Sequence, residues 1–324
     1  MTTTKSLYLI LLFLIIYPVT RAQDQAVSVA ALPEAVILFD KGHQQFTAGQ
    51  LKESIITFNE ALKLHPDFPE AYNSICVSQF ELQQYQDARI SCESAVRIKP
   101  DFYVGFYNLG RVFEELNLHL DAIDAFKESI RLKPDYFLAY YNLGGNYYNS
   151  QQYQLAVESL ETAVKLNPSD AESHVLLGAA YSKAKRPQAA VESLTKGIKL
   201  KPKSIFWGNL GVVYLEQKKF GEAIEAFNAA LELEPEQPLL HYWLAFTLYR
   251  AKDEKLAIEH YQKAIQFKPD FADAYHELGL IYLKSRQKDA ALDQYKRLRT
   301  IDGNLASSLF KQIFADKLLK APNQ

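Results

Sequence analysis

The chain has 324 residues, 48% of them hydrophobic, and its 13 Gly and 13 Pro are too few for a collagen-like or low-complexity sequence. Its 36 basic and 38 acidic residues give a formal net charge of −2, with both signs interspersed along the sequence. Nucleic-acid-binding domains typically carry a basic face, so this distribution argues against a nucleic-acid partner.

The first 22 residues have the pattern of a secretory signal peptide. Lys5 precedes an almost unbroken apolar stretch at 7–19. Thr20, Arg21 and Ala22 then form a short, more polar segment before the expected cleavage site. The alternative is an uncleaved anchor, but this stretch is shorter than the ~20 residues that span a bilayer. We expect cleavage after Ala22, a short flexible segment at 23–33, and no membrane span in the mature chain.

We therefore expect an exported protein, periplasmic or secreted. The sequence has no Asn-x-Ser/Thr acceptor site for glycosylation, which favours a bacterial envelope over a eukaryotic secretory route.

Beyond the predicted signal peptide, seven regularly spaced prolines show an internal repeat. From Pro66 to Pro269, successive members of this series are 34, 34, 34, 34, 33 and 34 residues apart. A small residue, usually Ala, stands twelve positions before each proline, and a Leu-Gly pair or a variant of it stands twelve positions earlier still. The recurring prolines are Pro66, Pro100, Pro134, Pro168, Pro202, Pro235 and Pro269.

Each repeat contains two apolar stripes of helical spacing, separated by a short polar break. Small residues at the Gly and Ala positions allow two antiparallel helices to pack closely, and Pro ends the second helix. This pattern resembles the tetratricopeptide repeat (TPR), which has a 34-residue period. The resemblance covers residues 34–304 and implies an all-α fold, a right-handed superhelical α-solenoid of about eight helix-turn-helix repeats. The expected repeats are 35–68, 69–102, 103–136, 137–170, 171–203, 204–237, 238–271 and 272–304.

Two local features depart from the regular pattern. The connection between Pro202 and Leu210 is one residue shorter than its equivalents, so we expect an altered superhelical step between repeats five and six. After the last repeat, apolar residues at helical spacing in 305–320 predict a C-terminal capping helix, because a terminal repeat must cover its exposed face. The alternative is a partner-binding tail.

Cys76 takes the Gly position of repeat two, and Cys92 takes the Phe position of its second helix. In an antiparallel hairpin that turns near Gln83 and Gln84, the two cysteines lie nearly opposite each other, which permits a disulfide. The alternative is a pair of buried thiols that fill the core.

No group of residues outside the repeat pattern indicates catalysis. The seven His have no metal-ligand spacing, and the two Cys do not form a Cys-x-x-Cys motif. His174 and His241 replace a repeat aromatic, which favours a core or rim position. We expect a non-enzymatic protein without a cofactor or a bound metal.

In the TPR family the first helix of each repeat lines a concave groove, and in some members a ladder of Asn binds the backbone of an extended peptide. The matching residues here are Asn108, Asn142 and Asn209, although Asn is also common at this position for packing. Repeat seven has aromatic residues spaced so that they lie on the inward-facing side of its first helix. Such residues suit either a binding hot spot or the hydrophobic core. The predicted partner-binding residues are therefore Asn108, Asn142, Asn209, Tyr107, Tyr141, Tyr242, Trp243, Phe246 and Tyr249.

The sequence thus predicts an exported, non-catalytic scaffold for protein–protein interaction that binds a peptide or a protein in its groove. The alternative is an obligate structural subunit of a cell-envelope assembly, or an oligomer of this chain.

Overall fold

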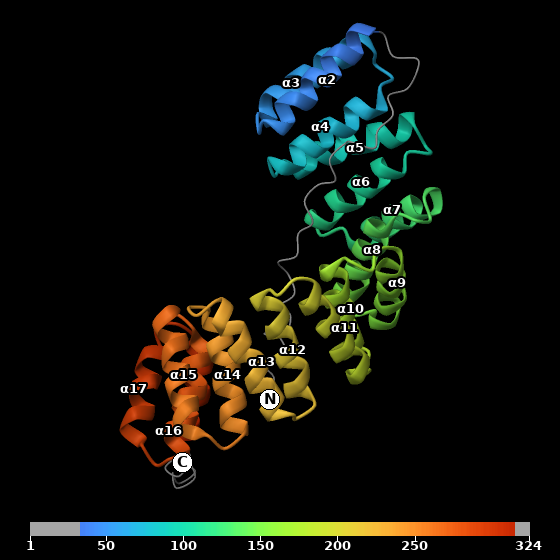
Figure 1. Cartoon of the computed structure of the whole chain (residues 1–324). Helices are drawn as coiled ribbons and strands as arrows, with labels where there is room; N and C mark the ends of the chain where they lie inside the picture. Colours follow the sequence, from blue (N-terminus) through green and yellow to red (C-terminus); the bar gives the residue numbers. More distant parts are fainter. Residues whose placement is uncertain (1–32, 315–324) are drawn as a thin grey trace, which may run out of the picture. The chain divides into compact units, whose positions relative to one another are not determined.

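The computed structural model describes residues 33–314, which hold 17 helices and no strand (Figure 1). This confirms the all-α fold class that the sequence predicts. The predicted signal peptide, nearly all of segment 23–33 and the last residues of the predicted cap lie outside the described part of the chain. None of the described helices is both long and apolar enough to cross a membrane.

The chain divides into two compact units, whose described parts are residues 33–185 and 186–314. We call them the N-terminal and the C-terminal unit. The N-terminal unit contains α2 (Pro33–Thr47), α3 (Leu51–Leu64), α4 (Pro69–Glu81), α5 (Tyr85–Ile98), α6 (Tyr103–Glu115), α7 (His119–Leu132), α8 (Phe137–Asn149), α9 (Tyr153–Leu166) and α10 (Ala171–Lys183). The C-terminal unit contains α11 (Pro187–Leu200), α12 (Ser204–Glu216), α13 (Phe220–Leu233), α14 (Pro238–Arg250), α15 (Glu254–Phe267), α16 (Ala272–Lys284), α17 (Lys288–Leu298) and α18 (Gly303–Ile313).

Within each unit, consecutive helices pack as antiparallel hairpins, and each hairpin packs on the next one. The small residue of the first helix permits this contact. A Cβ atom on Gly110 would lie 2.6 Å from Cε1 of Phe126, and a Cβ on Gly211 would lie 2.7 Å from Cε1 of Phe227. Both distances are too short for any side chain but hydrogen, so the Gly–Phe contact sets how closely the two helices approach.

Every hairpin turn contains a residue with a left-handed backbone. In the first turn it is Gly49, with φ of 78°. In the α4–α5 turn it is Gln83, whose N–H donates to Phe80 O, while Gln84 N–H donates to Gln79 O, the two bonds of a Schellman motif. The other left-handed residues have φ between 59° and 74°, and they are Asn117, Gln151, Lys185, Lys218, Lys252 and Arg286.

The short connection predicted from Pro202 is present. Residues 201–203 join α11 to α12, whereas the four residues 234–237 join α13 to α14. Lys203 at the start of α12 has an extended backbone, with φ of −110° and ψ of 145°.

The last helix, α18, covers the end of the C-terminal unit. Asp302 Oδ1 accepts hydrogen bonds from the N–H groups of Asn304 and Leu305 and so caps the helix start. Leu309 packs where Gly279 of α16 leaves room, since a Cβ on Gly279 would lie 2.6 Å from Leu309 Cδ2. The predicted capping helix is therefore present, and it ends at Ile313.

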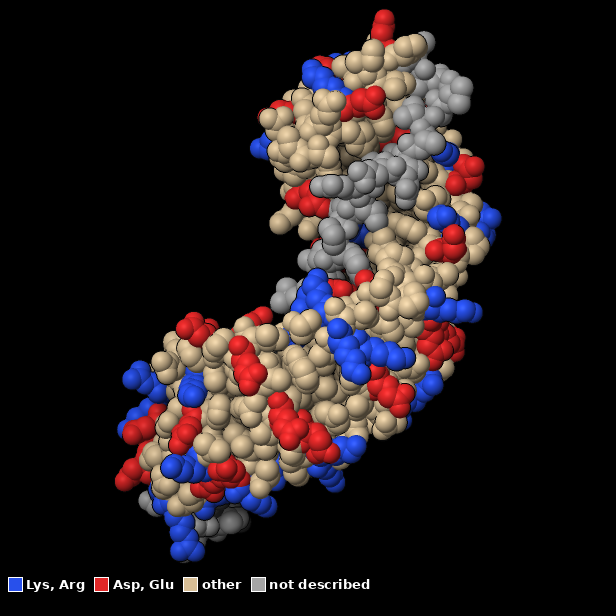
Figure 2. Space-filling view, in the orientation of Figure 1, with Lys and Arg blue, Asp and Glu red and all other residues tan. Residues whose placement is uncertain are grey.

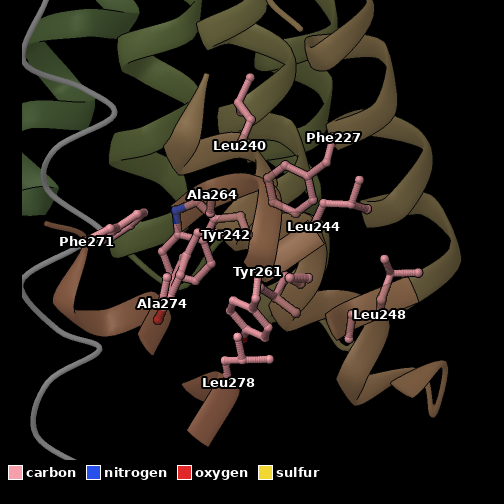
Figure 3. Packing of buried hydrophobic residues seen from close by; sticks show 14 of the residues in the cluster. Phe227, Leu240, Tyr242, Leu244, Leu248, Tyr261, Ala264, Phe271, Ala274 and Leu278 are labelled. Atoms are coloured by element: carbon pink, nitrogen blue, oxygen red, sulfur yellow. The ribbon is translucent and has the colours of Figure 1, made fainter. Parts of the chain in front are cut away.

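The core of the C-terminal unit is dominated by aromatic and aliphatic side chains of α13, α14, α15 and α16 (Figure 3). Three aromatic rings surround the ring of Tyr242. The distances between ring centroids are 5.6 Å to Tyr261, 5.2 Å to Phe271 and 5.3 Å to Trp243. This cluster fixes the positions of α14 and α16, which carry the candidate site.

Candidate functional site

The Asn residues of the predicted ladder have different environments. In the N-terminal unit, Asn108 Nδ2 donates to Asn73 Oδ1 at 2.9 Å, and Asn142 Nδ2 donates to the Tyr107 hydroxyl at 3.1 Å. Both amides are therefore engaged between neighbouring hairpins. In the C-terminal unit, Asn209 is 7% exposed, and its Nδ2 has no hydrogen-bond partner among the described residues.

A buried amide without a partner costs free energy of about 1–3 kcal/mol, so such groups require a partner that satisfies them. Asn209 stands directly before the Leu210-Gly211 pair of α12, the position that the family resemblance assigns to the groove. Of the three predicted ladder residues, Asn209 is the one whose Nδ2 has no hydrogen-bond partner within residues 33–314, although this atom is buried.

The predicted aromatic residues divide into two groups. Tyr107, Tyr242 and Trp243 are at most 1% exposed, so they pack inside the protein and offer no ring surface. The prediction that these three contact a partner is wrong, because their rings fill the interior between neighbouring helices. Figure 3 shows Tyr242 directed toward Phe271 and Ala274.

Tyr141 is also buried, at 5% exposed, and burial raises the pKa of its hydroxyl well above its ordinary value. Phe246 and Tyr249 remain partly exposed on α14. They are the aromatic side chains of the predicted set that keep surface for a partner.

Phe246 and Tyr249 line a surface pocket of about 470 Å³ between α14, the following turn and α16. We call this the repeat-seven pocket. Its other lining residues are Arg250, Lys252, Glu254, Glu277 and Lys284. The pocket lies on first helices of the hairpins, the layer to which the family resemblance assigns the groove.

Contacts within the repeat-seven pocket hold its side chains in place. Lys284 Nζ donates to the Tyr249 hydroxyl at 3.0 Å and lies 5.2 Å from the centroid of the same ring. The Arg250 guanidinium lies 5.9 Å from the centroid of Phe246. Ser285 donates a hydrogen bond to Glu254 and so links the start of α15 to the end of α16.

The sequence missed most of this pocket. It identified Phe246 and Tyr249, but not Lys284 of the next repeat. The signal that could have found Lys284 is its spacing, because it follows Arg250 by one 34-residue period and therefore occupies the same place in the next hairpin.

A second group that the sequence missed lies in the N-terminal unit. Burial raises the pKa of Glu114 to about 8, and a hydrogen bond of 2.6 Å from Asn146 Nδ2 opposes that change. Arg111, which stacks at 4.5 Å over the Phe80 ring, also lowers this pKa. These residues form a buried polar layer between α4, α6 and α8.

The predicted core or rim role of the two repeat-position histidines agrees with their contacts. His174 Nε2 donates to Pro168 O at 3.0 Å, and His241 Nε2 donates to Pro235 O at 2.9 Å. Across residues 33–314 there is no group of three or more His, Cys, Asp or Glu side chains placed to hold a metal ion.

The α4–α5 hairpin contains a disulfide between Cys76 and Cys92, with the two Cα atoms 5.3 Å apart. Both residues are fully buried. The bond takes the place of the Gly–Phe contact that other hairpins use at the same two positions.

Three family models match most of the chain. A model described as TPR repeat matches residues 144–184, 211–252 and 255–285. Two models described as tetratricopeptide repeat match residues 39–101 in one case and 105–136, 171–204 and 272–304 in the other.

Curated relatives share only short stretches with this chain. The Hsp70-Hsp90 organising protein of Plasmodium falciparum is 29% identical over 104 residues, which is 30% of this chain and 18% of that protein. The peroxisomal targeting signal receptor of Candida albicans is 34% identical over 71 residues, which is 22% of this chain and 12% of that protein. The chain therefore spans less than a fifth of the length of either relative.

Among solved structures, a chain of the APC/C hetero-tetramer Cut9-Hcn1 matches with a TM-score of 0.58 and 18% identity. The match covers 85% of this chain and 55% of that chain, and at this identity it shows the fold alone. The family rests on the matched repeats, which together cover most of the chain: the protein is a member of the tetratricopeptide repeat family.

Proposed function

We propose that this protein is a non-catalytic interaction scaffold that binds an extended peptide segment of a protein partner on α12, α14 and α16. The observation that carries the proposal is the repeat-seven pocket, where two partly exposed aromatic side chains lie beside charged ones on the first helices of neighbouring hairpins. The partly exposed rings of Phe246 and Tyr249 supply the apolar contacts that commonly dominate binding energy.

The relatives support this class of function. One is named an Hsp70-Hsp90 organising protein and another a targeting signal receptor, and both names are consistent with recognition of proteins or peptides through this repeat. Both relatives are far longer than the shared region, so the identity of this protein's partner is a separate question.

We also propose that the protein acts in an oxidising compartment outside the cytoplasm. The disulfide between Cys76 and Cys92 supports this, because disulfides persist in exported proteins and are rare in a reducing cytosol. The apolar run at 7–19 supports the same proposal, as the pattern of a signal peptide. Fractionation of cells that produce the full chain tests it: we expect a shortened, oxidised protein outside the cytoplasm, and a full-length cytosolic protein with free thiols would contradict the proposal.

The peptide-binding function is tested by selection from a random peptide library on the immobilised full chain. We expect enriched peptides that bind the unaltered protein and lose most of their affinity for a Phe246→Ala, Tyr249→Ala variant. Phe310→Ala is the matched control, because Phe310 is a partly exposed Phe on α18, away from the pocket. No enrichment, or equal loss in the control, would contradict the proposal.

A further inference from the structure

Two successive hairpins of the C-terminal unit carry opposite charges at the same repeat positions. These positions lie three residues before, one residue before and one residue after the recurring proline. In residues 199–203, which we call the lysine segment, they are Lys199, Lys201 and Lys203. In residues 232–236, which we call the glutamate segment, they are Glu232, Glu234 and Glu236.

Other repeats mix the two signs at these positions. Repeat three has Arg131, Lys133 and Asp135. There, Arg131 forms a salt bridge of 2.6 Å with Glu128, and Lys133 forms one of 3.1 Å with Asp135. Over most of the face drawn in Figure 2, basic and acidic side chains likewise lie interspersed. The separation of sign between repeats five and six is therefore a local departure from the repeat.

Both segments lie on the surface of the C-terminal unit. Five of the six charged side chains are exposed, and Lys203 is partly exposed. Each segment also has an exposed leucine between its first two charges: Leu200 is 46% exposed and Leu233 is 48% exposed. An apolar side chain inside a charged rim is the usual arrangement of a protein–protein interface.

The charges of both segments oppose the local helix dipoles. Glu232 and Glu234 lie at the C-terminal end of α13, whose last turn has no basic residue, although this end of a helix carries partial negative charge. Lys203 is the N-cap residue of α12, and its Nζ lies 5.3 Å from the ring centroid of Phe206, although the N-terminal end carries partial positive charge. An oppositely charged partner would relieve both unfavourable placements.

The position of the two segments makes the surface complementary to itself. They lie at the same end of successive hairpins, because the lysine segment leads from α11 into α12 and the glutamate segment leads from α13 into α14. A two-fold axis between them places the lysine segment of each copy against the glutamate segment of the other. The same rotation brings Leu200 of each copy toward Leu233 of the other.

We infer that this protein forms a two-fold symmetric dimer, in which the lysine segment of each copy binds the glutamate segment of the other. A polyanion would satisfy the lysine segment alone and would be repelled by the glutamate segment, whereas a second copy of the chain satisfies both. Neither segment contributes a residue to the repeat-seven pocket, so the inference does not depend on the proposed function.

Charge reversal in each segment tests the dimer, with sedimentation velocity as the measurement. One variant is Lys199→Glu, Lys203→Glu, and the other is Glu232→Lys, Glu236→Lys. Each is analysed alone and in an equimolar mixture with the other. The control is Lys218→Glu, Lys255→Glu, which changes the net charge as much as the first variant does. Both control lysines are exposed and lie at the opposite end of their hairpins.

We expect the unaltered protein to form a dimer that weakens between roughly 0.05 M and 0.5 M salt, because salt screens exposed charges. Each reversal variant alone should raise the dissociation constant about tenfold or more, because like charges then face each other. The mixture of the two variants should restore the dimer, since each copy then offers the other an opposite charge at both segments. Rescue in the mixture distinguishes contact between copies from a loss of folding or from charge pairing within one chain.

Four results would overturn the inference. They are a monomeric unaltered protein at low salt, a dimer that persists in either reversal variant, an equal loss of association in the control, and a mixture that stays monomeric. An assembly larger than a dimer would also contradict it, because the two-fold contact leaves neither segment open to a third copy.

Discussion

Cys76 is bonded to Cys92 at the two positions where Gly110 faces Phe126 in the following hairpin. The disulfide thus replaces a packing contact by a covalent bond within α4–α5. A loop of this length is stabilised by about 3 kcal/mol when it is closed by a disulfide.

Reduction should therefore lower the thermal stability of the unaltered protein. We expect a Cys76→Gly, Cys92→Phe variant to show no response to reductant and to recover part of the stability, because it restores the Gly–Phe contact of the neighbouring hairpin. Thermal unfolding with and without reductant measures both effects. A reductant effect of equal size in the double variant would show that the disulfide is not its cause.

Gly110→Ala should destabilise the protein by about 1–3 kcal/mol, because the new Cβ would lie 2.6 Å from the Phe126 ring and the helices would have to separate. Gly221→Ala is the matched control, since a Cβ there meets nothing within 4 Å. In this exposed helical position alanine should stabilise by up to about 1 kcal/mol. Urea unfolding of both variants is the measurement, and the same sign for both would contradict the packing role of Gly110.

Lys218 has a φ of 60° in the turn between α12 and α13, a conformation that glycine adopts without strain. Lys218→Gly should therefore stabilise the protein by about 0.5–1 kcal/mol. Glu225→Gly, in the exposed interior of α13, should instead destabilise it by about 1 kcal/mol. Equilibrium unfolding distinguishes the two, and a destabilised Lys218→Gly would exclude a left-handed backbone at this turn.

The stability of the C-terminal unit should fall in mild acid because of a histidine pair. His241 Nε2 donates to Pro235 O, so its Nδ1 accepts from His260 Nδ1 at 2.9 Å. Burial, and then the charges of His241 and Lys263, lower the pKa of His260 to about 4. The unfolded chain binds a proton near pH 6.5, so this contribution to stability is lost as the pH falls from about 6.5 to about 4.

Because the His260 ring is partly exposed, the loss is on the order of 1 kcal/mol. His260→Asn keeps a hydrogen-bond donor but does not titrate in this range, so its stability should be less sensitive to pH. Urea unfolding at pH 7.5, 6 and 4.5 compares the two proteins. An identical pH dependence would show that the histidine pair is not responsible.

Tyr242 and Phe246 should respond differently to truncation. Tyr242 is 1% exposed among aromatic neighbours, so Tyr242→Ala should cost about 3–5 kcal/mol of stability. Phe246 is partly exposed, so Phe246→Ala should cost clearly less while it weakens peptide binding. Parallel unfolding and binding measurements test this, and a larger stability loss for Phe246→Ala would reverse the assignment of the two residues.

The fold could be predicted from the sequence because helix packing restricts which residue types fit at the repeat positions. Pro ends a helix, and only a small residue such as Gly110 fits against Phe126, so both recur with the period of the structure. The left-handed turns were less visible, because Gln83 or Lys252 rather than Gly occupies them. Local hydrogen bonds of the turn, not residue type, impose that conformation.

The site could be predicted only in part, because the exposure of a side chain depends on its neighbours in space. Trp243 and Phe246 lie three positions apart on one apolar helix, yet the first is buried and the second is partly exposed. The same limit applies to the Asn residues, since Asn108 donates to Asn73 whereas the Asn209 donor has no partner in the part of the chain that the structure describes. These differences arise from which hairpin packs beside each residue.

Peptide binding on α12, α14 and α16 is tested by amide hydrogen–deuterium exchange of the full chain, measured with and without a saturating peptide from the library selection. Slower exchange should be confined to these helices and to the turn around Lys252. Protection concentrated instead on α13 and α15, or in residues 33–185, would contradict the claim.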